Sequence, residues 1–114
     1  MAETGWPSEE QLAQVVHIRR DAYDVYIGRP GQGEEGPWGN RFTIGEAGSR
    51  ERAIELYRLW LWREIRARRI TLEQLAALHG KRLGCFCAPL ACHGDVLARA
   101  AAWAVGELRR REAA

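Results

Sequence analysis

The chain has 114 residues, of which 46% are hydrophobic and 28% charged, and its formal net charge is +2. This length suits one domain with a single hydrophobic core, and this composition is typical of a globular protein rather than a disordered one. The net charge is too small to indicate nucleic-acid binding by itself. The sequence also has no run of about 18 apolar residues, which a membrane-spanning helix would need.

We expect residues 1–13 to form an N-terminal arm and residues 14–114 to form a single α/β domain. The first ten residues are acidic and polar, whereas a secretory signal peptide is basic and then apolar. The sequence therefore predicts a cytoplasmic protein, whose cysteine thiols stay reduced.

Two short strands are expected at the start of this domain. Residues 14–19 and 23–27 are rich in β-branched and aromatic side chains, and the short link 20–22 suggests a hairpin between them. The next segment, 28–48, contains seven glycines and two prolines, which excludes a helix. We expect a long loop there, with a short strand at 38–44, and loops of this length tend to be functional.

A long helix is expected after this loop. Ser49 can cap a helix that runs to about Arg68, and six apolar side chains recur along it at helical spacing. These inward-facing positions are Ala53, Ile54, Tyr57, Trp60, Leu61 and Ile65. Leu59 and Trp62 fall outside this set, so they are candidates for an exposed surface that forms a homodimer.

The rest of the chain predicts two more helices and a third strand. Thr71 and Gln74 form a capping box that opens a short helix ending at Gly80. Residues 81–87 are predicted to form a strand, and residues 92–110 a final helix. The expected fold is therefore α/β, a small three- to four-stranded sheet with three main helices packed against it.

All three cysteines lie in the connection between the third strand and the final helix. Strand alternation places Cys85 and Cys87 on the same face, and Pro89 turns the chain before Cys92 and His93 begin the helix. Unpaired N–H groups at a helix N-terminus favour an anion, which predicts a lowered pKa for the Cys92 thiol.

Three interpretations of this cluster remain open. Cys85, Cys87, Cys92 and His93 supply the ligand types of a structural zinc site, although their spacing is unusual and the adjacent pair points apart. The second interpretation is a reactive thiol at Cys92, with His93 or His17 as its acid–base partner. The third is that the cysteines are simply buried, as cysteines often are.

Four other residues are candidates for binding a ligand. Arg29 stands between a glycine and a proline, and its guanidinium suits a phosphate or a carboxylate. Trp38 can stack on a base and the Asn40 amide can read a base edge, although a core Trp and a turn Asn would fit the pattern equally well. Asp95, in the first turn of the final helix, is the fourth candidate.

These motifs resemble a family of small bacterial and phage proteins known as domain of unknown function 4326. Its pattern reads G-R-P, then W-G-N-P-F, then C-x-C-x-P-x-x-C-H-G-D. The matching segments here are Gly28–Pro30, Trp38–Phe42 and Cys85–Asp95. Arg41 stands where the family usually has proline, and the segment 31–37 is longer than usual. The resemblance implies no activity.

We therefore expect a protein that binds a nucleotide or a nucleic-acid-derived anionic ligand at the Cys/His cluster. Arg29 and the helix N-terminus would hold the anion, Trp38 and Asn40 the base, and in a thiol-dependent enzyme Cys92 and His93 would do the chemistry. The alternatives are a non-catalytic zinc-stabilised binding module and a homodimeric interaction protein.

Overall fold

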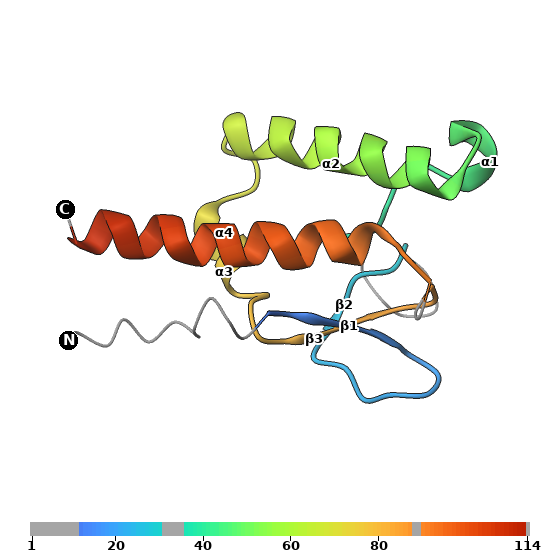
Figure 1. Ribbon diagram of the computed structural model, residues 1–114, viewed down its shortest axis with the longest axis horizontal. Coiled ribbons are helices and arrows are strands. Elements are labelled where there is room, and N and C mark those ends of the chain that lie inside the picture. The colour runs from blue at the N-terminus through green and yellow to red at the C-terminus, as the bar shows by residue number, and fades with distance from the viewer. Residues whose placement is uncertain (1–11, 31–35, 88–89, 114) are drawn as a thin grey trace.

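A computed structural model describes residues 12–30, 36–87 and 90–113 (Figure 1). These residues form an α/β domain with one small parallel sheet. Its strands are β1 (Gln14–His17), β2 (Val25–Tyr26) and β3 (Arg82–Cys85). Its helices are α1 (Ile44–Ala47), α2 (Arg50–Arg66), α3 (Leu72–Ala76) and α4 (His93–Ala113). The expected fold class is confirmed.

The sheet has the order β1-β3-β2, with both outer strands parallel to the central one. The expected hairpin between β1 and β2 is therefore wrong. After β1 the chain returns across one face of β3, where the Tyr23 ring and the Ile18 side chain lie so close to Gly84 that a Cβ there would clash with both. Asp24 then anchors β2 to β3, because its carboxylate accepts the Arg82 N–H at 2.8 Å.

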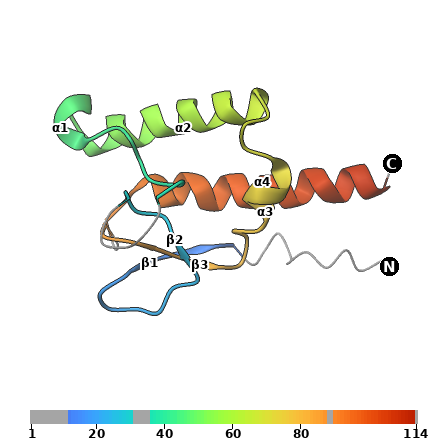
Figure 2. The same cartoon turned by 180° about the vertical axis from the view of Figure 1, so that it is seen from behind.

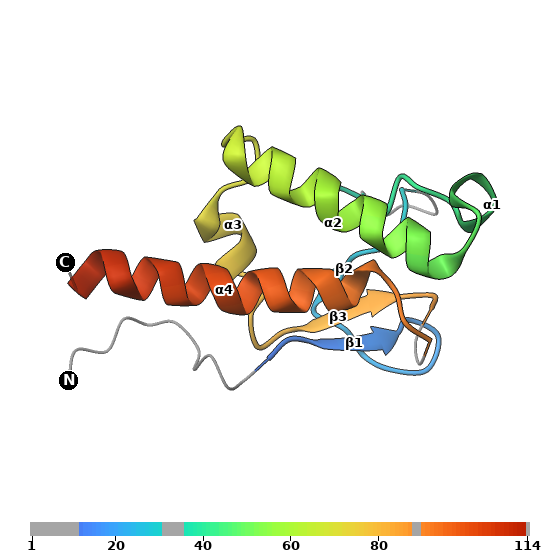
Figure 3. The ribbon, with the colours of Figure 1, turned by 45° about the horizontal axis from the view of Figure 1, so that its top comes forward.

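All the helices lie on one side of the sheet, and α4 runs between α2 and the strands (Figures 1 and 2). The same stacking is visible when the top of the molecule, with α2, is turned toward the viewer, and in this view α3 lies beside the middle of α4 (Figure 3). Apolar burial between these layers drives folding. The largest fully buried apolar side chains are Ile27, Tyr57, Leu61, Leu75, Leu83, Leu97 and Val105.

The helix starts follow the expected caps. Ser49 accepts the Arg52 N–H with its hydroxyl, and Thr71 and Gln74 form the predicted capping box. In α2 the buried residues are Ala53, Tyr57 and Leu61, as their spacing predicts, whereas the other members of that set are partly buried.

The short strand expected at residues 38–44 is also wrong. The Asn40 side-chain oxygen accepts the Phe42 N–H at 2.9 Å, a backbone group that a strand would need for its own pairing, and the Asn40 amide donates to the Ala53 carbonyl of α2 at 3.2 Å. Thr43 then caps α1. The segment is an irregular loop that Asn40 fastens to α2.

Ala13, the last residue of the expected N-terminal arm, is buried and packs in the core. Of the rest of the predicted arm, Leu12 is exposed, and residues 1–11 are outside the described residues. Pro89, predicted to end the third strand, is likewise outside them. Among the helices that the structure describes, none is long and apolar enough to cross a membrane.

Gly39 tests how tightly the loop packs on the strand end. A Cβ at this position would lie 2.8 Å from the Gly28 carbonyl oxygen and 3.0 Å from the Arg29 Cα. Both are backbone atoms, so they can move away only if the chain itself shifts. We expect Gly39→Ala to lower the free energy of unfolding by about 1–3 kcal/mol in urea titrations.

Gly45→Ala is the matched control, because a Cβ at Gly45 would meet nothing within 4 Å. Gly45 lies in α1, where alanine favours the helix more than glycine does, so the free energy of unfolding of this variant should be unchanged or slightly higher. Equal stability of the two variants would contradict the close packing of the loop at Gly39.

Candidate functional site

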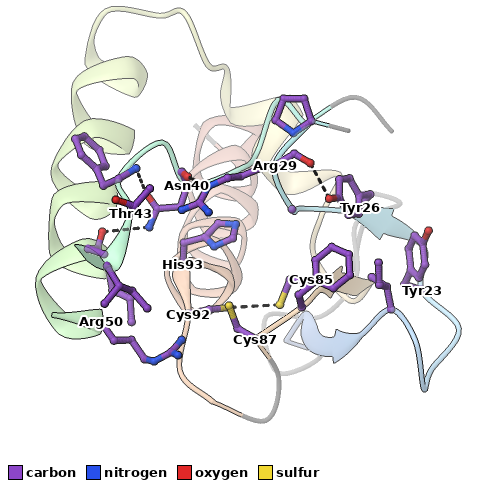
Figure 4. A pocket seen from close by; sticks show the side chains of 18 residues that line it. Tyr23, Tyr26, Arg29, Asn40, Thr43, Arg50, Cys85, Cys87, Cys92 and His93 are labelled. Atoms are coloured by element: carbon purple, nitrogen blue, oxygen red, sulfur yellow. Dashed lines mark hydrogen bonds between the residues drawn. The ribbon is translucent and has the colours of Figure 1, made fainter. Parts of the chain in front are cut away.

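A pocket of about 680 Å³ opens at the carboxyl ends of the parallel strands (Figure 4). Its walls come from the ends of the three strands, the loop that follows β2, and the first turns of α1, α2 and α4. This edge of a parallel sheet is where α/β proteins usually bind ligands, and the volume suits a small molecule. The structure thus brings together the segments that the sequence motifs singled out.

The three cysteines form one cluster in the wall of this pocket. Cys85 ends β3, Cys87 follows two residues later, and Cys92 directly precedes α4. The sulfurs of Cys85 and Cys92 are 3.5 Å apart and share a hydrogen bond, and all three sulfurs lie within 4.8 Å of one another. Three cysteines this close could hold a metal ion.

Cys92 also serves as the N-cap of α4. Its sulfur accepts the Gly94 N–H at 3.3 Å, while the Asp95 carboxylate accepts the Cys92 N–H at 3.2 Å. The two bonds are reciprocal like those of a capping box, except that a thiol accepts the N–H of the second helical residue where a hydroxyl would accept that of the third. Asp95, a predicted ligand-binding residue, therefore fixes the first turn of the helix and is not among the residues that line the pocket.

His93 lies beside the cysteines in sequence but is used differently. Its Nε2 donates to the Ile27 carbonyl at 2.6 Å, and its ring packs edge-on against Tyr57 at 4.9 Å between centroids. Among the residues described, the sulfur cluster contains the three cysteines and not His93. Burial lowers the pKa of His93, although the Ile27 carbonyl favours its protonated form.

The thiol of Cys92 is not the activated one that its place at a helix start predicts. The hydrogen bond to Cys85 and burial raise its pKa, and they outweigh the Gly94 N–H, which favours the thiolate. In the metal-free protein the expectation of a lowered pKa is therefore wrong, and at neutral pH the thiol is protonated. His17, the other suggested partner, accepts the Arg19 N–H with its Nδ1 at 3.1 Å.

The loop residues divide into those that face the pocket and those that build its walls. Arg29 lines the pocket, and its Nε donates to the Asn40 carbonyl at 2.9 Å. Asn40 also lines it, with its side chain committed to the two bonds that fasten the loop. Trp38 packs against the core and its carbonyl accepts the Tyr57 hydroxyl at 2.8 Å, so it is not among the pocket-lining residues.

Several pocket residues had no signal in the sequence. Arg50 opens α2, donates to the Ala91 carbonyl at 3.1 Å and lines the pocket opposite the strands (Figure 4). Tyr23, Tyr26 and Phe86 supply aromatic rings. Because contacts far apart in the chain bring these side chains together, no local pattern marks them.

The two residues proposed for a homodimer surface differ in exposure. Leu59 is exposed, whereas Trp62 is partly buried and stacks edge-on against Trp103 of α4 at 4.8 Å. A homodimer through this face stays a prediction.

Fold and site together define a class of small α/β domains with a three-cysteine cluster in a pocket at the carboxyl edge of a parallel sheet. The sequence profile described as "Domain of unknown function (DUF4326)" matches residues 11–103, and the chain belongs to this family.

A relative occurs in Enterobacteria phage T4, where it is described as an uncharacterised 12.4 kDa protein in the nrdA-td intergenic region. It is 41% identical over 95 residues, which cover 83% of this chain and 82% of the relative. No solved structure matches the chain significantly.

The raised pKa of Cys92 predicts a specific loss of stability at alkaline pH. The folded state holds the thiol proton more tightly than the unfolded chain, so the thiol stabilises the fold below its ordinary pKa of 9.0, and this contribution is lost as the pH rises above that value. We expect the Tm of the reduced, EDTA-treated protein to fall between ~pH 8 and ~pH 10.

Cys92→Ser is the control, because its hydroxyl does not titrate and its Tm should fall less over this interval. Burial and, to a smaller extent, the charge of a Cys92 thiolate also raise the pKa of Tyr57, so the buried phenol should still cause part of the decline in Cys92→Ser. A parallel decline of the two proteins would contradict the protonated state of Cys92.

Proposed function

We propose that this protein binds a nucleotide or a nucleic-acid-derived anionic ligand in the pocket beside its three cysteines. The observation that carries the proposal is the pocket's lining, which combines two guanidinium groups with several aromatic rings in a cavity of about 680 Å³.

The charge of the pocket favours an anion. Arg29 and Arg50 line it from the loop after β2 and from the start of α2, whereas none of its described lining residues is an Asp or Glu. A guanidinium suits phosphate because it can donate two parallel hydrogen bonds. The pocket is therefore complementary to a phosphate or carboxylate group.

The aromatic lining favours a flat ligand. Tyr23, Tyr26, Phe42 and Phe86 all line the pocket, and Phe86 is exposed. Stacking of a base on an aromatic ring contributes about 1–3 kcal/mol of binding free energy, largely regardless of which base it is. A planar base attached to a phosphate would satisfy both the rings and the arginines.

Binding is better supported than thiol catalysis. A nucleophilic cysteine needs a lowered pKa and a base within reach, whereas the pKa of Cys92 is raised and the His93 ring donates to a backbone carbonyl. We therefore propose a ligand-binding protein rather than a thiol-dependent enzyme, acting in the cytoplasm, where its free thiols stay reduced.

Arg50→Gln tests the proposal. Calorimetric titration with AMP, ATP and inorganic phosphate should show the nucleotides binding more tightly than phosphate alone, because only they engage the rings. Removing the guanidinium should weaken nucleotide binding about tenfold, the value of one charge-assisted hydrogen bond.

Arg52→Gln is the matched control, since Arg52 is exposed on the same helix and is not among the residues that line the pocket. Its nucleotide affinity should equal that of the wild type. Failure of all these nucleotides to bind, or equal losses in both variants, would reject the proposal.

The second candidate function is a zinc-stabilised binding module. It is favoured by the three sulfurs within 4.8 Å of one another, since thiolates are preferred zinc ligands. Zinc would deprotonate the thiols, and its binding energy would add to the stability of the fold.

Elemental analysis of protein grown with zinc should then find one zinc ion per chain, and EDTA should lower the Tm. Cys85→Ser, Cys87→Ser and Cys92→Ser should each lose most of the metal. Phe86→Leu, a change between two of these cysteines, should retain it. Protein that stays zinc-free after growth with zinc would reject this candidate and leave the nucleotide proposal standing.

A further inference from the structure

We propose that the cysteine cluster is an open metal site, in which three thiolates hold a zinc ion whose fourth position faces the pocket and takes an anionic group of the ligand. This inference rests on the zinc candidate above and joins it to the nucleotide pocket.

The spacing of the sulfurs suits three corners of a tetrahedron. Zinc–sulfur bonds of about 2.3 Å in tetrahedral geometry put sulfurs about 3.8 Å apart. The sulfurs of Cys85 and Cys92 are 3.5 Å apart, and the largest separation in the cluster is no more than 4.8 Å. Small side-chain rotations would bring all three within bonding distance of one ion.

The neighbouring groups able to serve as a fourth zinc ligand are engaged in other hydrogen bonds. His93 donates to the Ile27 carbonyl at 2.6 Å, and the Asp95 carboxylate accepts the Cys92 N–H. In the part of the chain that the structure describes, neither residue joins the sulfur cluster. Three protein ligands plus one exchangeable position is the arrangement of zinc sites that act on bound molecules, whereas structural sites have four protein ligands.

The fourth position would open toward the ligand, because Cys85, Cys87 and Cys92 all line the pocket (Figure 4). In this view the cysteines lie together at one side of the pocket. Arg29 reaches the pocket from the loop after β2, and Arg50 reaches it from the start of α2.

The charges around the cluster favour an anion in that position. Three thiolates and Zn²⁺ carry one net negative charge, which would repel an anion in isolation. Arg29 and Arg50 line the same pocket and offset that charge, and the Gly94 N–H stabilises the Cys92 thiolate at the start of α4. The site as a whole therefore accepts one further negative group.

Cobalt(II) is the probe that tests this geometry. We would titrate Co²⁺ into the reduced, metal-free protein without oxygen and record its visible ligand-field bands and thiolate charge-transfer bands. One equivalent should give a tetrahedral, thiolate-rich spectrum. Azide should then shift the ligand-field bands, because it replaces water at the open position, and in protein saturated with Co²⁺ Arg50→Gln should weaken azide binding several-fold.

His93→Gln separates the open site from a closed one. A glutamine amide can still donate to the Ile27 carbonyl, and the variant should keep both the cobalt spectrum and its response to azide. X-ray absorption of the zinc-loaded wild type gives the same answer without a substitution, since a bound imidazole adds characteristic outer-shell scattering and none is expected.

The alternative outcomes point to different errors. A cobalt spectrum that azide leaves unchanged, or imidazole scattering in the wild type, would overturn the open site and leave the zinc module intact. A protein that binds no Co²⁺ in its reduced state would overturn both. Nucleotide binding by the metal-free protein is measured in a separate titration. The cobalt and X-ray results therefore do not decide whether the pocket binds nucleotides.

Discussion

The buried hydrogen bond from the His93 ring to the Ile27 carbonyl is the contact on which the site depends. It ties the first turn of α4 to the residue directly after β2, and Tyr57 packs against the same ring while its hydroxyl holds the Trp38 carbonyl. Strand, loop and two helices thus converge on one imidazole. This convergence positions Cys92 against the end of β3 and holds the loop after β2 in the wall of the pocket.

The same elements serve both the cysteine cluster and the charged, aromatic pocket. The loop after β2 supplies Arg29, the start of α2 supplies Arg50, and the start of α4 supplies Cys92. A metal bound by the thiols and an anion bound by the guanidiniums would therefore lie in one cavity. The cysteine cluster and the arginine-lined pocket are best regarded as two parts of a single site.

Local signals in the sequence predicted local structure well. The caps at Ser49 and Thr71 and the buried spacing in α2 are observed, because each depends on residues a few positions apart. The gathering of the cysteines could be foreseen for the same reason, since one strand–turn–helix connection carries all three.

Features that depend on distant contacts could not be predicted. Alternation indicates a strand but not its partner, so the parallel pairing of β1 and β2 with β3 was missed. Arg50 reaches the pocket only because α2 packs beside α4. The pKa of Cys92 follows from the Cys85 thiol and burial, neither of which its place at a helix start reveals.

The central position of β3 also determines when the sheet can form during synthesis. Gln14 pairs with Arg82, and Val25 with Leu83, so both early strands must wait for a segment that leaves the ribosome much later. Such long-range pairing is slow, whereas α2 and its cap can form locally. We expect the cysteines to be enclosed last, so that the nascent chain presents all three to the metal and redox chemistry of the cell before the fold protects them.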